Sequence, residues 1–135
     1  DPSGGLLASH LYTGNLLDDG AGTFDIESLD KGPELFADIA GFAFFEAGNP
    51  HFPKDAVIVA DYWQKAITAF ELDENGAPSS ATEQSVATFD PMDVPEPRGA
   101  SGLVVDPVSG DLLFIGYENA RLFAIRGFAP PAKAP

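Results

Sequence analysis

The chain has 135 residues, no cysteine, 44% hydrophobic residues and a formal net charge of -14 at pH 7. Its length suits one domain with a core, and the lack of cysteine in the sequence excludes disulfides, a thiolate nucleophile and a cysteine-ligated metal. The acidity disfavours nucleic acid and anionic lipid as partners, because like charges repel, and no apolar run approaches the roughly 20 residues that span a bilayer. The 11 phenylalanines predict a large aromatic core.

The first third of the chain reads as three strands separated by turns. Residues 6–12, 23–29 and 34–39 are runs of strand length that contain β-branched or large apolar side chains. Residues 14–22, which are rich in glycine and aspartate, predict the first turn. The sequence Asp-Lys-Gly-Pro at 30–33 predicts a break between the second and third of these strands.

The middle of the chain reads as four strands at residues 41–45, 56–62, 67–72 and 84–89. A glycine- and proline-containing segment at 48–55 predicts the first turn, and Asp-Glu-Asn-Gly at 73–76 predicts a tight turn with a positive φ at the glycine. Residues 90–99 contain three prolines, which exclude regular structure there.

The last third gives three further strands at 103–105, 112–117 and 121–125, followed by a proline- and alanine-rich tail at 129–135. Leu6, Val57 and Leu112 occupy equivalent places in their units and lie 51 and 55 residues apart. A period near 50 residues with four short strands per unit indicates a β-propeller.

The sequence therefore predicts an all-β fold, a propeller segment of about two and a half four-stranded antiparallel blades that is incomplete at both ends. The first blade, residues 1–39, lacks its first strand. The second, 40–90, is complete, and the third, 91–128, lacks its fourth strand. This last deficit predicts a strand supplied from elsewhere along residues 121–128.

Three segments resemble blades of the lactonase-like and NHL-like superfamily of six-bladed propellers: 59–62 (Val-Ala-Asp-Tyr), 67–73, and 102–107 together with 110–112. The chain resembles the C-terminal blades of such a ring. The resemblance implies that its partners are the remaining blades or further copies of the chain. It also implies that the ends of the second strands meet on one face near the axis of the ring.

The repeat register places His10, Asp61 and Gly116 at equivalent positions on this face. His10 and Asp61 together could bind a divalent cation such as Ca²⁺ or Zn²⁺, or a polar ligand. The alternative is that Asp61 caps the turn before the next strand. Asp18-Asp19-Gly20 and residues 73–76 are likewise open to Ca²⁺ ligation or to turn formation. The other residues expected on or beside this face are Tyr12, Tyr62, Trp63, Arg98, Tyr117 and Glu118.

These patterns predict a non-catalytic binding or scaffold propeller that engages a protein or a small polar ligand on this face. The alternative is a metal-dependent hydrolase of the lactonase or esterase type, with metal ligands shared with blades outside the chain. The family's metal-binding Asn precedes the glycine that opens a first strand, whereas here Ala40 and Ser101 occupy that place. The tail resembles the spacer of some exported bacterial proteins and predicts an extracellular or periplasmic location.

Overall fold

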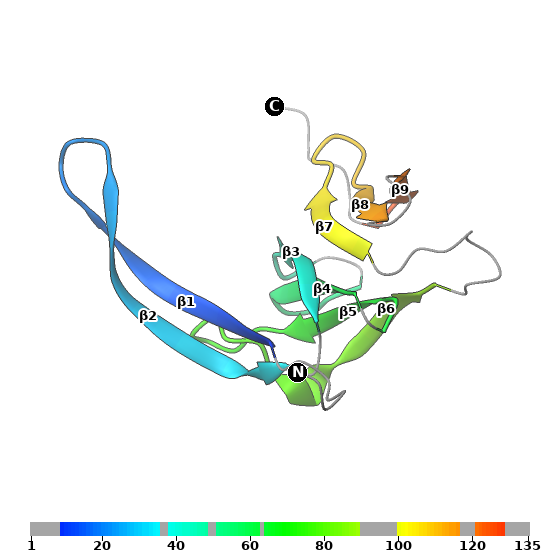
Figure 1. Ribbon diagram of the computed structural model, residues 1–135, viewed down its shortest axis with the longest axis horizontal. Coiled ribbons are helices and arrows are strands. Elements are labelled where there is room, and N and C mark those ends of the chain that lie inside the picture. The colour runs from blue at the N-terminus through cyan, green and yellow to red at the C-terminus, as the bar shows by residue number, and fades with distance from the viewer. Residues whose placement is uncertain are drawn as a thin grey trace, which may run out of the picture.

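The computed structural model describes residues 9–35, 38–48, 51–62, 64–89, 100–116 and 121–128. These residues form nine strands and a single 3-10 turn, η1 (Ser80–Thr82), which confirms the all-β prediction (Figure 1). The strands make three antiparallel sheets, none of which closes on itself. The predicted tail at 129–135 lies outside the described residues.

Each sheet is built from strands that are consecutive in the chain. The hairpin consists of β1 (Ser9–Asp18) and β2 (Phe24–Leu35). The middle sheet has the order β3 (Ile39–Phe45), β4 (Ala56–Asp61), β5 (Ala66–Glu71) and β6 (Gln84–Thr88). The third sheet has the order β7 (Ala100–Val105), β8 (Leu112–Gly116) and β9 (Arg121–Ile125).

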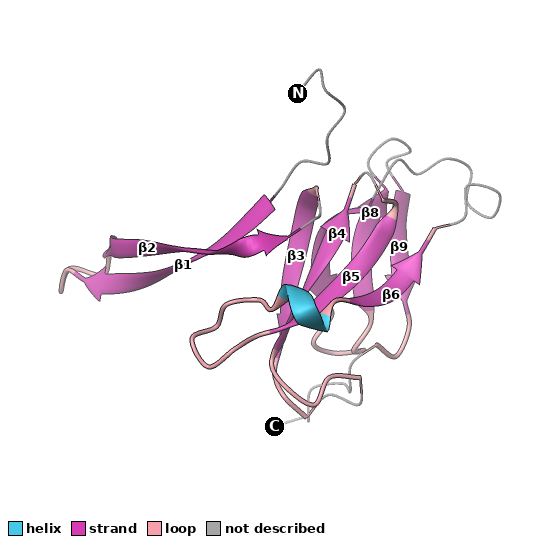
Figure 2. Cartoon of the chain, turned by 90° about the horizontal axis from the view of Figure 1, so that it is seen from below, coloured by secondary structure: helices cyan, strands magenta, loops and turns pink. Residues whose placement is uncertain are grey.

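The hairpin extends away from the other two sheets (Figures 1 and 2) and is longer than the sequence predicted. The prediction of a turn over residues 14–22 was wrong, because β1 continues to Asp18 and the chain reverses over residues 19–23. Asp19 Oδ1 accepts hydrogen bonds from the N–H groups of Ala21 and Thr23 at 2.8 and 3.1 Å. One aspartate thus organises a short turn, and the residues before it are free to pair.

The predicted break at 30–33 was also wrong, because β2 runs through it. Lys31 lies opposite Tyr12 and Glu34 lies opposite His10, so β2 carries one extra residue between these pairs. This irregularity is a β-bulge, and it accommodates Pro33, which has no N–H for the ladder.

The middle sheet is buried on both faces at its centre. All six residues of β4 are buried. Ala56, Ile58 and Ala60 belong to the core shared with the third sheet, whereas Val57 and Val59 pack with Leu35 of the hairpin and with Phe70. A strand of this kind reads in the sequence as a continuous apolar run.

The middle and third sheets pack face to face, and β3 lies against β7. The tightest approach is between Gly41 and Gly102: a Cβ atom added to Gly41 would lie 2.4 Å from the backbone nitrogen of Gly102. At the far end of the interface Phe128 packs edge-on against Phe45, with 5.1 Å between ring centroids. The missing side chain of Gly41 therefore lets the first strands of neighbouring sheets come into backbone contact.

We expect Gly41→Ala to lower the free energy of unfolding by about 1–3 kcal/mol, the usual cost of overpacking, because the new Cβ forces β3 away from β7. Urea denaturation measures the change. Gly102→Ala is the matched control: its Cβ meets open space, but its φ of +58° costs about 1–2 kcal/mol of backbone strain. Near-UV circular dichroism should change in Gly41→Ala and stay native in Gly102→Ala. A native spectrum and an unchanged urea midpoint in Gly41→Ala would contradict the contact.

Aspartates organise the tight turns of all three sheets. Asp106 accepts hydrogen bonds from the N–H of Val108 and the hydroxyl of Ser109, both at 2.9 Å. These bonds, led by the one from Val108, hold the pKa of Asp106 below its ordinary value. Asp73 Oδ1 accepts two backbone N–H groups in the same way, from residues 75 and 77. The carboxylates considered for Ca²⁺ at residues 18–20 and 73–76 are thus used in turns.

A lowered pKa makes folding stability depend on pH. The ionised Asp106 stabilises the turn above the ordinary aspartate pKa of 3.8, and this contribution is lost as the pH falls through the lowered folded value. We expect the urea midpoint of the native chain to fall between about pH 5 and pH 2 more steeply than that of Asp106→Ala. Asp106 lies at the surface and is only half-buried, so water screens its charge and the difference in slope is small. Equal slopes would rule out this contribution.

Candidate functional site

The structure brings the first residues of β1 and β3 close to the last residue of β4. The N–H of Ile39 donates to Ser9 Oγ at 3.4 Å, and Ile39 pairs with Asp61 across the β3–β4 ladder. The N–H of Tyr62 donates to the carbonyl of Asp38 at 3.0 Å. Ile39 thus contacts Ser9, the neighbour of His10, and pairs with Asp61, while the convergence of the His10 and Asp61 side chains stays a prediction.

His10 is half-buried on β1, and its Nδ1 donates to the carbonyl of Gly32 at 2.9 Å. Because a carbonyl oxygen can only accept, this bond places the proton on Nδ1 and leaves Nε2 as an acceptor. A carbonyl partner of this kind is also how proteins orient a metal-binding histidine. Tyr12, two residues on, is exposed. In the neutral ring of this tautomer, Nε2 of His10 is the nitrogen that can accept a hydrogen bond.

Asp61 is only 1% exposed and ends β4. Its Oδ1 accepts the N–H of Gln64 at 2.9 Å and so holds the turn into β5. This turn contains Lys65, whose φ of 53° lies in the left-handed region that non-glycine residues seldom adopt. The carbonyl of Lys65 in turn accepts the N–H of Phe89 at 2.9 Å. Asp61 therefore acts as the cap of a strained turn, one of the two roles that the sequence left open.

Metal binding by His10 and Asp61 stays a prediction. Within residues 9–35, 38–48, 51–62, 64–89, 100–116 and 121–128, no group of three or more histidine, aspartate and glutamate side chains is placed to hold a metal ion. Four residues predicted for the same face lie outside the described residues: Trp63, Arg98, Tyr117 and Glu118.

The sequence did not predict the cleft between the outer strands of the middle and third sheets. This cleft, called the β6–β9 cleft here, has a volume of about 420 Å³, within the range of ligand pockets. Asp111 Oδ1 accepts the N–H of Gly127 at 2.9 Å, and Gly127 has a φ of +64°. This bond fixes the segment after β9, which forms one wall of the cleft. The lining residues are His51, Phe52, Gln84, Ser85, Val86, Ile125, Arg126, Gly127 and Phe128.

Comparisons with protein family models, curated proteins and solved structures gave no match. The structure itself therefore defines the class, an all-β protein of consecutive antiparallel sheets. Its described helical content is a single 3-10 turn, which has neither the length nor the apolarity to cross a membrane.

We expect Asp61→Ala to reduce the free energy of unfolding by about 1–2 kcal/mol, because the N–H of Gln64 loses its acceptor and the buried carboxylate is replaced by a smaller side chain. Asp61→Asn keeps an oxygen acceptor and should cost less. Thermal denaturation of the two variants measures the difference. If Asp61→Asn is as unstable as Asp61→Ala, the charge of Asp61 and not its capping bond is what the fold requires.

Proposed function

We propose that this chain is a non-catalytic binding or scaffold module, formed by successive blades of a β-propeller, that engages protein partners through sheet faces. The middle and third sheets have four and three strands, the numbers expected from the sequence. The first sheet has two strands and not the expected three, because residues 34 and 35 belong to β2 and Ile39 begins β3. The proposed partners are the remaining blades or further copies of the chain, and the proposed location is outside the cytoplasm.

The way the sheets face one another supports the blade hypothesis. Val57 and Leu112 lie 55 residues apart and occupy equivalent places in the repeat. Val57 packs toward the hairpin, which precedes its sheet, and Leu112 packs toward the middle sheet, which precedes its own. Gly41 and Gly102 are also equivalent, and they bring the first strands of the two sheets together. A rotational array of blades requires equivalent residues such as Val57 and Leu112 to face the preceding sheet.

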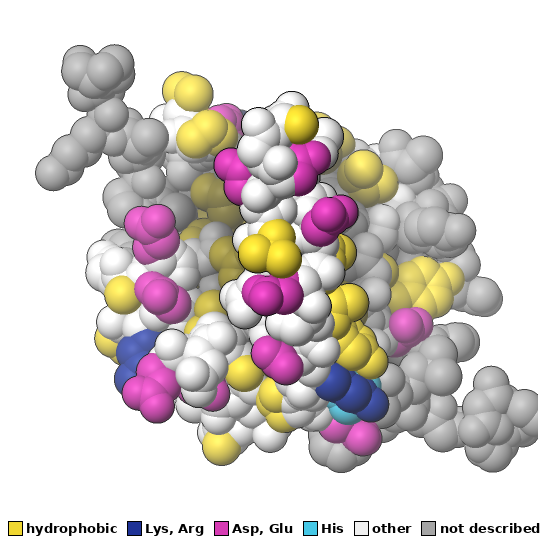
Figure 3. Space-filling model, turned by 90° about the vertical axis from the view of Figure 1, so that its left-hand side faces the viewer, with side chains coloured by type: hydrophobic (Ala, Val, Ile, Leu, Met, Phe, Trp, Pro, Cys, Tyr) yellow, Lys and Arg dark blue, Asp and Glu magenta, His cyan; other side chains and the backbone are white. Residues whose placement is uncertain are grey.

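The observation that carries the proposal is the amount of apolar surface left exposed. One face of the hairpin is apolar, since Ile26 and Leu29 lie over Gly14 and Leu16 pairs with Ile26. Phe24 and Leu29 are about 60% exposed. In the end view of Figure 3, hydrophobic side chains lie beside acidic ones. We call the following set the hairpin apolar face: Tyr12, Leu16, Phe24, Ile26 and Leu29.

The third sheet has a second such surface on the side turned away from the middle sheet. Ile115 pairs with Leu122, Val104 is exposed on the neighbouring strand, and a shallow hollow of about 220 Å³ lies among them. Three phenylalanines are exposed as well, which corrects the expectation that all of them are buried: Phe24, Phe42 and Phe44. Contiguous apolar surface of this kind marks an interaction site.

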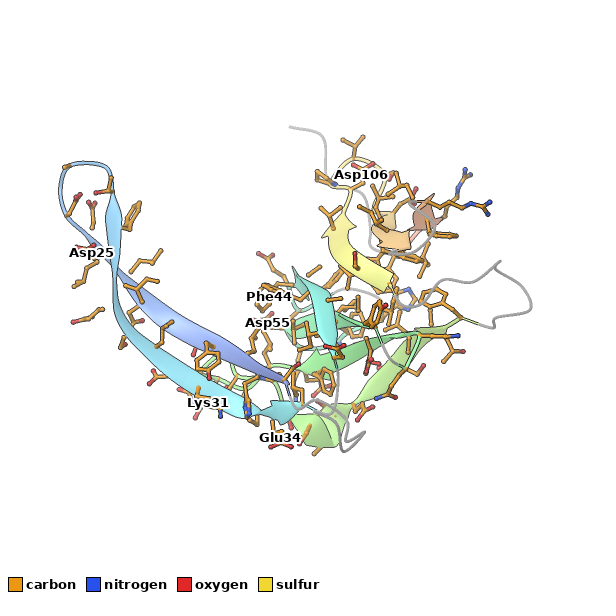
Figure 4. All side chains as sticks on the ribbon, viewed as in Figure 1. Asp25, Lys31, Glu34, Phe44, Asp55 and Asp106 are labelled. Atoms are coloured by element: carbon orange, nitrogen blue, oxygen red, sulfur yellow. The ribbon has the colours of Figure 1, made fainter. Side chains whose placement is uncertain are left out.

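The acidic residues leave these faces accessible. Figure 4 shows Asp25 on the outer side of the hairpin, away from the other sheets. Asp25 pairs with Leu17 on the face opposite Leu16 and Ile26. The hairpin thus presents one face that is mainly apolar, with Lys31 and Asp18 beside Tyr12 and Phe24 at its two ends, and a second face that carries Asp25. A protein sheet suits the first face, and the second keeps the chain soluble.

We expect the purified chain to associate through the hairpin apolar face. Sedimentation velocity over a range of concentrations should give a mass above the 14.2 kDa of one chain. The triple variant Leu16→Ser, Ile26→Thr and Leu29→Ser should weaken association at least tenfold, since it removes much of the apolar area.

The matched control is the triple variant Thr13→Ser, Asn15→Ser and Ser28→Ala, on polar positions of the same hairpin. It should associate as the native chain does. A mass of one chain at every concentration, in a compact state that unfolds cooperatively, would contradict the proposal.

A further inference from the structure

The outer edge of the third sheet has backbone groups available for pairing. The N–H of Asp106 donates to the carbonyl of Asp111 at 2.9 Å, so these residues form a hydrogen-bonded pair at the β7–β8 turn. Hydrogen-bonded and non-hydrogen-bonded pairs alternate along an antiparallel ladder. It follows from the register that Leu112 and Phe114 direct their N–H and C=O groups toward β9.

The same alternation fixes the orientation of β9. Ile125 pairs with residue 112 and Phe123 pairs with residue 114, so both direct their backbone groups toward β8. Leu122 and Ala124 therefore direct theirs outward. Among the described strands none pairs with this edge. An edge of this kind is a template for another strand.

The middle sheet shows which strand such an edge takes. In the repeat register, Leu122 and Ala124 correspond to Ile67 and Ala69 of β5. Those two residues pair with β6, Ala69 with Gln84. β6 is short and antiparallel to β5, and it follows Glu83 directly. The chain thus contains its own example of the strand that would complete the third sheet.

The β6–β9 cleft lies beside this edge and is suited to side chains of an added strand. Its walls come from β6 and from the segment that follows β9, and Phe128 is buried against Phe45 and Phe52 at one end. In an added strand, the side chains opposite Phe123 and Ile125 lie on the core side of the sheet. They would point toward Val86. The walls of the cleft are mixed, with Phe52, Val86 and Phe128 continuing the core that the two sheets share and Gln84, Ser85 and Arg126 supplying polar groups.

The charge at the cleft favours an acidic partner. Although the chain carries a net charge of -14, no acidic residue is among the described residues that line the cleft, and Arg126 is exposed at its rim. No carboxylate of the described residues forms an ion pair with Arg126. Suppose that an added strand pairs with β9 in the register in which β6 pairs with β5. The residue of that strand corresponding to Glu83 then lies opposite Ile125, next in sequence to Arg126.

We propose that the free edge of β9 binds an extended strand of a partner polypeptide, antiparallel to β9, with an acidic residue near its N-terminal end. This inference deepens the proposed binding function and rests on it. Backbone hydrogen bonds to Leu122 and Ala124 supply affinity, the β6–β9 cleft receives alternate side chains, and Arg126 selects the acidic end.

The test uses a synthetic peptide with the sequence of residues 83–89, Glu-Gln-Ser-Val-Ala-Thr-Phe, blocked at both ends and labelled with fluorescein. Fluorescence anisotropy with the full chain should show saturable binding. Arg126→Ala should weaken binding at least tenfold, whereas Lys31→Ala, the same charge change on the remote hairpin, should leave it unchanged. Replacing the peptide's Glu by Gln should weaken binding to the native chain but not further to Arg126→Ala.

Two N-methylated peptides test the backbone pairing without altering the protein. In β6, the N–H groups of Gln84 and Ala87 face β5, whereas those of Ser85 and Thr88 face away. Methylation at the equivalents of Gln84 and Ala87 should therefore abolish binding, and methylation at the equivalents of Ser85 and Thr88 should preserve it.

Equal binding of both methylated peptides, or no binding of the unmodified peptide, would overturn the proposal. If the unmodified peptide does not bind, the arginines at the ends of β9 serve only to block pairing at this edge. The proposed function is judged separately by sedimentation. If the chain associates with itself but does not bind the peptide, only the proposal for the β9 edge is rejected. If the chain binds the peptide but stays a single chain at every concentration, the proposed binding through sheet faces is rejected and the proposal for the β9 edge stands.

Discussion

The backbone contact between Gly41 and Gly102 is the constraint on which the arrangement of the sheets depends. Stacked sheets ordinarily lie about 10 Å apart because side chains fill the space between them. Gly41 has no side chain to fill that space at one edge, so β3 comes into contact with the backbone of Gly102 in β7. The close contacts between the two sheets involve β3, β4 and β7, and the β6–β9 cleft lies between the outer strands. The same contact thus sets the packing at one edge and the cleft at the other.

The divergence also decides which surfaces remain exposed. The middle sheet has neighbours on both faces and contains fully buried strands, whereas the hairpin and the third sheet each have a neighbour on one side among the described residues. Their other faces keep the apolar residues of a buried sheet, such as Leu29 and Leu122, at 59% and 69% exposure. A lone sheet in a monomer would carry polar residues there. The exposed faces of the hairpin and the third sheet therefore have the amino acids of a sheet that is covered on both sides, although each sheet lies at an end of the described stack.

The sequence predicted the number and order of the strands in the middle and third sheets, because each strand is a short apolar run bounded by strong turn residues. It failed in the hairpin. There Pro33 and Gly32 suggested a break, but a bulge in β2 absorbs the proline, and register is a property of two strands that a single run does not reveal. The face of His10 and Asp61 was predicted from the repeat, yet burial of Asp61 depends on how sheets stack. The β6–β9 cleft likewise depends on how the sheets stack, which includes the Gly41 contact. It could not be predicted from the individual strands.

The distribution of charge follows from the exposed edges. The hairpin carries six acidic residues and one lysine between residues 9 and 35, so two hairpins repel each other and do not pair edge to edge. β9 differs, since Arg121 begins it and Arg126 follows it. An acidic strand is attracted to this edge but repelled by the hairpin. The unpaired backbone groups make both the hairpin edge and the β9 edge able to pair with another strand. The charged side chains near each edge decide which strands it can accept.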